Sequence, residues 1–340
     1  MMSATTTRAT FLATLGGASA LAALPVPGLA QTNARRIDVH RHVSPPFYQD
    51  AIKGLYPKPF PPPLATWTPE RCLADMDAAG IELGMLSMPA RPGMAFGDVA
   101  AARKLCRDTN EYLANLRREH PGRFGMFAAL PLPDLEGSVA ELTYALDVLK
   151  ADGVGAWTSY GMKYLGDPAF APVWAELDRR KAVVFTHPTD AACCVNPVPQ
   201  MSETVIEFAA DTTRAIGSIV FSGTSVRFPN IRFVFSHGGG SMPFVIDRFL
   251  GEAQDPKHAA LLPHGVEYEL RRFYYDTAFA SSPAAMAALM KIVPASQVVI
   301  GTDFPYRPGL ETIKELDVCG IAPRDLAAIG RQSALTLLGR

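Results

Sequence analysis

Short apolar runs alternate with longer amphipathic stretches along most of the chain. Eight runs are apolar almost throughout, which is typical of parallel strands buried on both faces. They cover residues 37–40, 81–88, 124–131, 154–159, 183–187, 231–237, 273–277 and 298–303. Helical patterns lie between and after them, at residues 69–80, 98–120, 135–151, 168–181, 205–216, 243–252, 283–292 and 322–338. Eight strand–helix units close most simply into a barrel, so the pattern predicts an α/β protein with a single (β/α)8 TIM-barrel domain over residues 36–340.

The stretch between the first strand and the first helix departs from this pattern. Residues 43–67 lack a clear period and contain Pro57, Pro59, Pro61, Pro62 and Pro63. Long segments after a barrel strand belong to the mouth of the barrel, where function concentrates. We therefore expect a proline-rich loop or small cap over the mouth, inserted in the single domain.

The first thirty residues have the layout of a cleavable export signal. Arg8 is their only charged residue, an apolar run follows from Phe11 to Leu24, and small residues precede Gln31. Thr7 stands where a twin-arginine signal has its first arginine, so both the Sec and the Tat route stay open. Residues 1–30 thus predict export to the bacterial periplasm, and no later segment is long and apolar enough to cross a bilayer.

The charge and cysteine content of the chain indicate which classes of partner to expect. Lys and Arg number 32 against 33 for Asp and Glu, so the chain has no basic excess to bind nucleic acid or an anionic membrane. The five cysteines are scattered, and Cys193 is followed directly by Cys194. Because adjacent cysteines close a disulfide poorly, we expect these two to be thiols. A small molecule is the expected partner.

Ionisable side chains stand where several of the predicted strands end. His40 and His42 lie at the end of the first strand, His187 ends the fifth, His237 the sixth and Asp303 the eighth. The C-terminal ends of the strands form the face on which barrel enzymes build their active sites. Burying such groups is costly unless they are paired or bind a metal. We therefore expect these five side chains to meet in one site.

Three imidazoles and a carboxylate suit a borderline divalent cation and leave a coordination position open. The set predicts one metal ion held by His40, His42, His187 and Asp303, with Zn²⁺ as the first expectation and Mn²⁺ as the second. His237 is either a further ligand or a free imidazole that moves a proton.

Several segments resemble a known family. Residues 235–244 (FSHGGGSMPF), 273–276 (FYYD) and 300–305 (IGTDFP) resemble the amidohydrolase superfamily and, within it, the branch of aminocarboxymuconate semialdehyde decarboxylase. That branch includes the γ-resorcylate and 6-methylsalicylate decarboxylases. Residues 124–133 (FGMFAALPLP) and 164–170 (YLGDPAF) are especially similar to the 6-methylsalicylate group. The resemblance covers nearly everything after residue 36.

The resemblance implies the same ligand set, with His237 as a catalytic helper and a homodimer as the assembly. Dinuclear members of the superfamily carry a carboxylated lysine after the fourth strand, whereas this chain has Thr158, Ser159 and Tyr160 there. One metal is therefore expected rather than two.

The resemblance favours a carbon–carbon lyase that removes CO2 without oxidation from a small aromatic or unsaturated carboxylate. In this hypothesis Asp303 carries a proton and His237 orients the substrate or stabilises negative charge. The alternative is a hydrolase of an amide or lactone, with Asp303 as general base, and the residues alone do not separate these two. A non-catalytic metal-binding barrel would have lost one of the five side chains, and all of them are present.

Candidate substrate-binding residues flank these groups. Flat rings at Trp157, Tyr160, Phe304 and Tyr306 suit a planar substrate, although each fits an ordinary core equally well. A cation for the substrate carboxylate is expected from Arg248, which the resemblance favours, or from Arg91. The alternative for Arg248 is a surface ion pair with Asp247 or Glu252.

Overall fold

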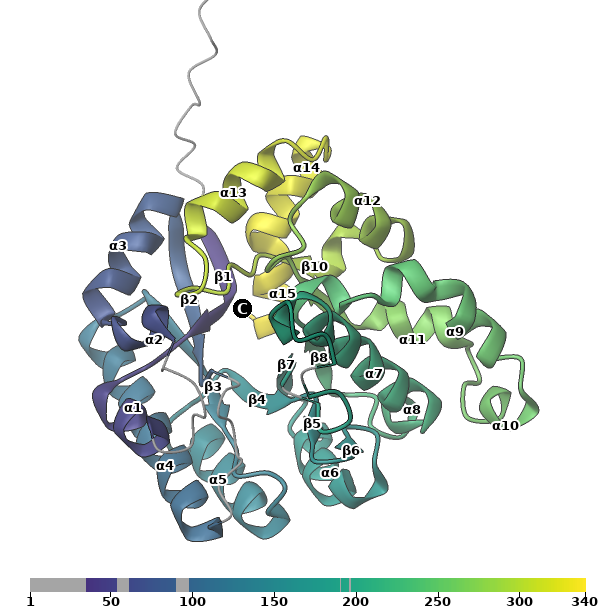
Figure 1. The fold of residues 1–340 in the computed structure, drawn as a ribbon, viewed down its shortest axis with the longest axis horizontal. Helices are drawn as coiled ribbons and strands as arrows, with labels where there is room; N and C mark the ends of the chain where they lie inside the picture. The colour runs from purple at the N-terminus through teal and green to yellow at the C-terminus, as the bar shows by residue number, and fades with distance from the viewer. Residues whose placement is uncertain (1–34, 54–60, 90–97, 190, 196) are drawn as a thin grey trace, which may run out of the picture. The chain divides into compact units, whose positions relative to one another are not determined.

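The structure, a computed structural model, describes residues 35–53, 61–89, 98–189, 191–195 and 197–340. Within these ranges eight parallel strands form one sheet in the order β1-β2-β3-β4-β7-β8-β9-β10. Parallel bridges from Asp38 to Ile300 and from Arg41 to Phe304 join the first strand to the segment after the last. The sheet therefore closes, and the predicted TIM barrel is confirmed (Figure 1). The predicted export signal, residues 1–30, lies outside the described residues.

The strands match the predicted runs in order but differ at their ends. The barrel strands are β1 (Arg36–His42), β2 (Ile81–Ser87), β3 (Phe124–Ala129), β4 (Gly153–Trp157), β7 (Val183–His187), β8 (Arg232–Phe235), β9 (Tyr274–Asp276) and β10 (Val298–Val299). A small antiparallel hairpin, β5 (Ser159–Tyr160) and β6 (Lys163–Tyr164), follows the fourth barrel strand and was not predicted. The last strand is shorter than the predicted 298–303, and Asp303 has a positive φ of 64°, which a strand does not adopt.

Helices alternate with the strands and surround the barrel (Figure 1). The helices are α1 (Pro46–Ile52), α2 (Pro62–Ala65), α3 (Pro69–Ala79), α4 (Val99–Glu119), α5 (Leu135–Asp147), α6 (Ala171–Arg179), α7 (Glu207–Phe221), α8 (Thr224–Arg227), α9 (Ile246–Glu252), α10 (Pro256–Ala259), α11 (Val266–Arg272), α12 (Pro283–Ile292), α13 (Gly309–Asp317), α14 (Pro323–Ala327) and α15 (Ser333–Leu338). Local signals set the boundaries of α3, for example. Thr68 accepts a hydrogen bond from the backbone N–H of Arg71 at its start, and Gly80 takes the left-handed conformation at its end. No helix within the described ranges is long and apolar enough to span a membrane.

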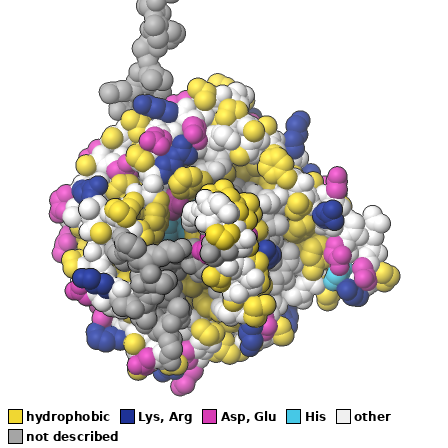
Figure 2. Space-filling model, in the orientation of Figure 1, with side chains coloured by type: hydrophobic (Ala, Val, Ile, Leu, Met, Phe, Trp, Pro, Cys, Tyr) yellow, Lys and Arg dark blue, Asp and Glu magenta, His cyan; other side chains and the backbone are white. Residues whose placement is uncertain are grey.

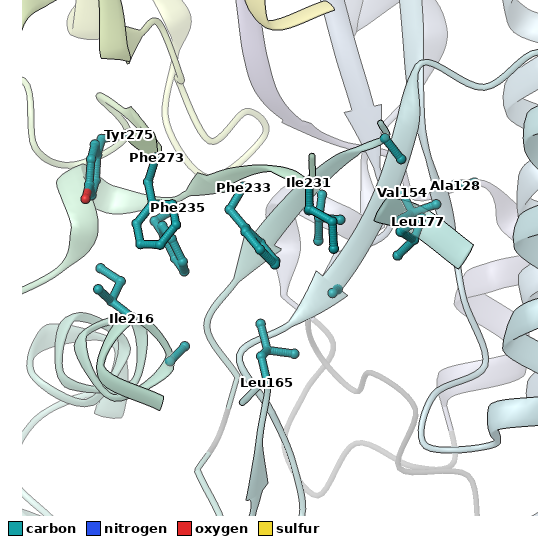
Figure 3. Close-up of a cluster of buried hydrophobic side chains, with 14 of the residues drawn as sticks. Ala128, Val154, Leu165, Leu177, Ile216, Ile231, Phe233, Phe235, Phe273 and Tyr275 are labelled. Carbon is teal, nitrogen blue, oxygen red and sulfur yellow. The ribbon is translucent and has the colours of Figure 1, made fainter. Parts of the chain in front are cut away.

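Two apolar layers support the site. The outer layer lies between the strands and the helices, and Figure 3 shows part of it, with Phe233, Phe235 and Ile216 among its members. The inner layer fills the barrel itself with Ile37, Val39, Leu83, Met85, Phe127, Val183, Phe185, Val234, Tyr274 and Val299, and with Ala334 and Leu337 from α15. Because the barrel interior is packed with side chains below the mouth, the polar side chains at the strand ends rest on a closely packed apolar layer.

The proline-rich segment is more regular than expected. Its described part forms α1 and α2, which favours the small cap among the two predicted alternatives, a loop or a small cap. Prolines occupy the first turn of each helix, where a missing N–H costs least. Tyr48 and Ile52 of α1 are buried in a cluster with Met88 and Trp157, which lie at the ends of β2 and β4. The segment thus packs against one side of the barrel mouth.

Candidate metal and active site

The five predicted side chains meet at the mouth of the barrel. His40 and His42 lie at the end of β1, His187 ends β7, His237 follows β8 and Asp303 follows β10. Their rings and carboxylate are buried or nearly so, with Asp303 6% exposed and the His237 side chain 11% exposed. Figure 2 shows histidine surface at the bottom of a hollow near the centre of this face. The sequence prediction of a single site at this face therefore agrees with the structure.

The distances are short enough for one shared ion. His40, His187, His237 and Asp303 offer one ligand atom each, and these atoms lie within 4.8 Å of one another. His42 belongs to the same cluster, because its Nε2 lies 2.8 Å from Asp303 Oδ1 and 3.2 Å from His40 Nε2. Both His42 and His237 thus lie beside the other three groups. The sequence predicted His42 as a metal ligand, and predicted His237 as either a further ligand or a free imidazole.

Several polar atoms of the cluster are buried without a hydrogen bond in the described structure. They are His42 Nδ1, His187 Nε2 and His237 Nδ1. His187 Nδ1 instead meets the carbonyl of Pro188 at 2.7 Å, so Nδ1 carries the proton and the Nε2 lone pair is free. Buried polar atoms are normally paired, and a cation satisfies lone pairs of this kind. The donor set therefore fits a divalent metal, and the described residues form a site for one such ion.

Asp276 orients the cluster and was missed as a functional residue. Its Oδ2 lies 2.7 Å from His40 Nδ1, while its Oδ1 accepts the backbone N–H groups of His237 at 2.9 Å and Ala278 at 3.0 Å. A carboxylate on the far ring nitrogen fixes the tautomer of a ligating histidine and raises its basicity. One buried side chain thus positions both His40 and the His237 turn. Its position at the end of β9 is the sequence feature that could have identified it as part of the site.

Burial and neighbouring charges set the ionisation of the cluster. Burial lowers the pKa of His42, and burial with the nearby imidazoles of His42 and His40 holds the pKa of His187 well below its ordinary value. Burial would also lower the pKa of His40, but the charges of Asp276 and Asp303 raise it to about 10. Burial would raise the pKa of Asp303, yet His40 and the hydrogen bonds from the histidines hold it well below its usual range. Burial thus favours neutral imidazoles at His42 and His187, whereas the paired charges favour a protonated His40 and an ionised Asp303.

The backbone at His237 and Asp303 is strained. His237 has φ 55° and Asp303 has φ 64°, a region that costs a residue other than glycine of order 1–3 kcal/mol. The glycines after His237 continue the left-handed turn, and a Cβ on Gly240 would collide with the carbonyl of Ala209. The surrounding structure holds these conformations, since Asp276 binds the N–H of His237 and the N–H of Asp303 donates to His40 O at 2.9 Å.

Arg41, between the two histidines of β1, points away from the cluster into a buried ion network. Its guanidinium lies 2.9 Å from Asp38 and 2.7 Å from Asp75, and it stacks over the ring of Phe304 at 4.4 Å. Asp38 also accepts the Thr302 hydroxyl at 2.6 Å and the N–H of His40 at 3.0 Å. The network therefore ties β1 to the residue before Asp303.

The predicted aromatic substrate-binding residues differ in how close they lie to the cluster. Trp157 lies at the mouth, edge-on to His187 with the ring centres 6.4 Å apart, and Tyr160 accepts the N–H of Trp157 at 2.9 Å. Phe304 is buried beneath Arg41, while the neighbouring Tyr306 ring meets His42 at 5.6 Å. These positions place Trp157 and Tyr306 beside the cluster and make Phe304 a supporting core residue.

The two predicted cations are not brought to the cluster. Arg248 is exposed on α9, which lies outside the barrel (Figure 1). Within this chain the described structure therefore does not place it to bind a substrate carboxylate at the cluster. Arg91 lies outside the described residues. Two rings that the sequence did not single out do reach the cluster. Phe208 lies 6.0 Å from the ring of His187, and Phe279 lies 6.3 Å from that of His237.

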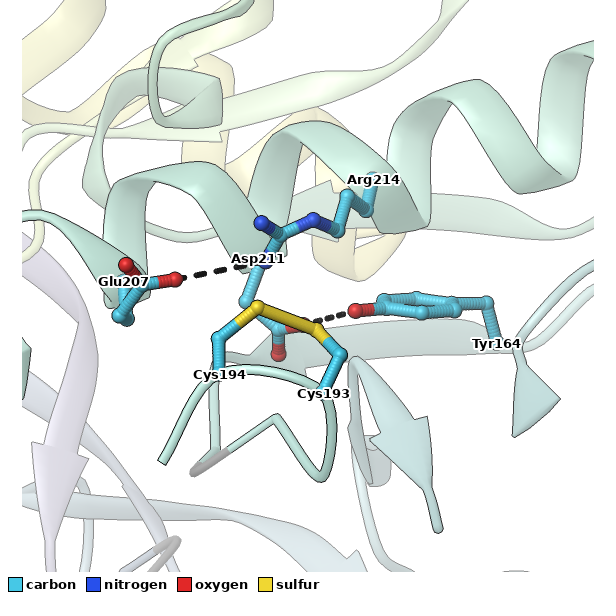
Figure 4. The surroundings of a disulfide bond; sticks show 6 residues. All are labelled: Tyr164, Cys193, Cys194, Glu207, Asp211 and Arg214. Atoms are coloured by element: carbon cyan, nitrogen blue, oxygen red, sulfur yellow. Dashed lines mark hydrogen bonds and ion pairs between the residues drawn. A yellow bond between two sulfur atoms is a disulfide. The ribbon is translucent and has the colours of Figure 1, made fainter. Parts of the chain in front are cut away.

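The adjacent cysteines form a disulfide, so the expectation of two thiols is wrong (Figure 4). A turn in which the Cys194 N–H donates to Ala191 O at 2.9 Å brings the two side chains together. Beside it, the buried carboxylate of Asp211 accepts the hydroxyls of Thr158 and Tyr164. These bonds tie the segments after β4 to α7, next to the loop that follows His187.

Comparison with known proteins identifies the family of the chain. The family model described as amidohydrolase matches residues 37–340. Decarboxylase yanB of Aspergillus niger is 36% identical over 326 residues, covering 90% of this chain and 88% of that protein. The 6-methylsalicylic acid decarboxylase acuB of Aspergillus aculeatus is 33% identical over 283 residues, covering 80% of this chain and 85% of that protein. A solved structure described as amidohydrolase II has a TM-score of 0.82 at 28% identity, covering 90% of this chain and all of that one.

The family model spans nearly all of the described barrel, and both relatives cover more than two thirds of the chain. The resemblance inferred from the strand-end motifs is therefore confirmed, and the chain belongs to the amidohydrolase family.

Proposed function

We propose that the protein is a metal-dependent decarboxylase that removes CO2 without oxidation from a small aromatic acid with a hydroxyl group beside its carboxylate. The observation that carries the proposal is the convergence of an ionised Asp303 with histidine nitrogens that lack hydrogen bonds at the mouth of the barrel. The identity to two proteins named as decarboxylases supports it, because both relatives extend over most of the chain.

His40, His42, His187 and Asp303 would hold the metal, and His237 would stay free to act on the substrate. His42 is fully buried, whereas His237 is the histidine of the cluster that opens most toward the mouth. When bound, a divalent cation neutralises the charge of the substrate carboxylate and hydroxyl. Zn²⁺ and Mn²⁺ both suit this mixture of imidazole and carboxylate.

The residues then move one proton. The ionised carboxylate of Asp303 accepts the proton of the substrate hydroxyl and delivers it to the ring carbon that bears the carboxylate. The carbon–carbon bond breaks, its electron pair stays with the ring, and CO2 leaves. His237 Nε2, which lies 3.4 Å from Asp303 Oδ2, orients that carboxylate and stabilises the charge that develops on the substrate. Solvent restores the proton of the hydroxyl.

The test combines metal content with CO2 release over a panel of salicylate, dihydroxybenzoate and muconate-type acids. We expect about one metal ion per chain and CO2 from at least one acid. His237→Ala should keep the metal and lose activity by about 10²- to 10⁴-fold, whereas Asp303→Ala should lose both. His264→Ala is the matched control, since that histidine is exposed on the surface. A metal-loaded protein that releases no CO2 from any of these acids would overturn the proposal.

Two further expectations belong to the same proposal. We infer from residues 1–30 that the precursor is exported, and from the family resemblance that the mature protein is a homodimer. Determining the N-terminal residue of the protein from a periplasmic fraction tests the first. The molar mass in solution tests the second.

A further inference from the structure

Helix α7 reaches the histidine cluster with its first turn. The ring of Phe208 in this turn lies 6.0 Å from that of His187 and 6.5 Å from that of His237. Asp211 follows three positions later and is fully buried. Because residues three apart in a helix lie on the same side, Asp211 and Phe208 share the side of α7 that meets the site.

The carboxylate of Asp211 is buried without an ion pair to any lysine or arginine of the described residues. Arg214, on the same helix, pairs instead with Glu207 at 3.6 Å (Figure 4). Burying an ionised carboxylate is costly unless other groups replace the lost water. The compensation therefore comes from hydrogen bonds, and the segments that donate them indicate what Asp211 does.

Two of its three described hydrogen bonds come from the segments beside His187. Oδ2 accepts the hydroxyl of Thr158, whose own N–H donates to His187 O at 3.0 Å. Oδ2 also accepts the N–H of Thr189 at 3.4 Å, two positions after His187. Oδ1 accepts the hydroxyl of Tyr164 at 2.7 Å, from the β5–β6 hairpin (Figure 4). One oxygen thus serves the loop of His187, and the other serves the hairpin.

The peptide group between Pro188 and Thr189 connects Asp211 to the His187 ring. Asp211 accepts the N–H of this peptide, and the carbonyl of the same peptide accepts Nδ1–H of His187 at 2.7 Å. A peptide group is planar, so fixing the direction of its N–H also fixes the direction of its C=O. That carbonyl keeps the proton on Nδ1 and leaves Nε2, which is buried without a hydrogen bond in the described structure, for a cation.

We propose that Asp211 is a positioning residue for the metal ligand His187, acting through the peptide between Pro188 and Thr189. The inference rests on the proposed function, in which His187 holds the cation. A carboxylate that accepts the N–H also polarises the peptide and makes its carbonyl a stronger acceptor for the imidazole. A stronger acceptor on Nδ1 raises the basicity of Nε2, so Asp211 both directs His187 and favours its binding to the metal.

Competition with a chromophoric chelator measures the Zn²⁺ affinity of each variant without any substrate. Asp211→Ala should weaken this affinity by about 10-fold, as expected for a residue that orients a metal ligand. Asp211→Asn keeps the shape but offers a neutral and weaker acceptor, so its loss should be intermediate. In a His187→Ala background, Asp211→Ala should change the affinity by under about 2-fold, because the ligand that it positions is gone.

Tyr164→Phe is the matched control. It removes a hydroxyl from the same buried carboxylate, but from the oxygen that serves the hairpin rather than the loop. It should lower the urea midpoint and keep the Zn²⁺ affinity within about 2-fold of wild type. If the alanine variant does not fold, Asp211→Asn with and without His187→Ala makes the same comparison.

Three results would overturn the inference. The first is a Zn²⁺ affinity of Asp211→Ala within about 2-fold of wild type, and the second is an equal loss with and without His187. The third is an equal loss in Tyr164→Phe, which would assign Asp211 to the general stability of the loop. The expected pattern in a protein that releases no CO2 from any acid would support the role at His187 and refute only the proposed function, since that role needs the metal alone.

Discussion

Replacing Arg41 by methionine should destabilise the protein strongly although Arg41 touches no predicted ligand side chain. Methionine keeps much of the side-chain volume but removes a guanidinium that lies 2.9 Å from Asp38 and 2.7 Å from Asp75. Asp38 is fully buried, and burial raises its pKa against the opposing charge of Arg41. Without that charge the carboxylate keeps only Thr302 and the N–H of His40 as partners. Removing one member of a buried ion pair costs about 3–5 kcal/mol.

Urea denaturation of the metal-loaded protein measures this cost. The second variant is Arg41→Met with Asp38→Asn, which removes both charges and should recover more than half of the loss. Arg103→Met is the control, since Arg103 pairs with Asp134 near the surface and its side chain is 44% exposed, so it should cost under about 1 kcal/mol. A cost for Arg41→Met no greater than that of the control, or no recovery in the double variant, would refute the role given to the network.

Three further results are expected. Asp276→Asn should weaken metal affinity by about 10- to 100-fold in competition with a chromophoric chelator, because the carboxylate orients His40, and unchanged affinity would contradict that role. Removing the metal with a chelator should abolish CO2 release and lower the urea midpoint, and adding Zn²⁺ or Mn²⁺ back should restore both, whereas full activity of the metal-free protein would refute the site. Hydrogen bonds from Arg307 and Ser281 hold the pKa of Glu315 below its ordinary value, so its ionised form stabilises the fold at neutral pH. The difference in unfolding free energy between wild type and Glu315→Gln should be full at pH 7 and shrink as the pH falls below about 4. A difference that grows with acidity would contradict the stabilising role of the ionised carboxylate.

The sequence predicted the barrel and the five clustered groups because both depend on local patterns. An apolar run that ends in a histidine or aspartate marks a strand and its mouth end together, as His187 does for β7. The eight apolar runs together then leave one simple way to close the sheet. The bounds of α4 followed for the same reason, since Asp98 caps this helix through a bond from Ala100 N, whereas α11 and α13 were not predicted.

What the sequence could not predict depends on groups that meet only after the barrel closes. Asp276 and His40 are 236 positions apart, so their hydrogen bond has no local signature. The partners of Arg41 could not be predicted either, because Asp75 lies 34 positions away on α3. The place of an exposed side chain is no easier to predict, and Arg248 is exposed on α9. The disulfide depends on a turn at Ala191 that no composition rule indicates.

In the proposed reaction this site replaces the carboxylate of an aromatic acid by a proton that Asp303 delivers. The most direct measurement runs the metal-loaded enzyme in D2O with an acid that it consumes and follows both CO2 and the isotopic content of the product. We expect equal amounts of CO2 and product, with one deuterium at the ring carbon that lost the carboxylate, and loss of both in Asp303→Asn. Turnover of a lactone or an amide without CO2 from any acid, or a product without deuterium at that carbon, would contradict the proposed reaction.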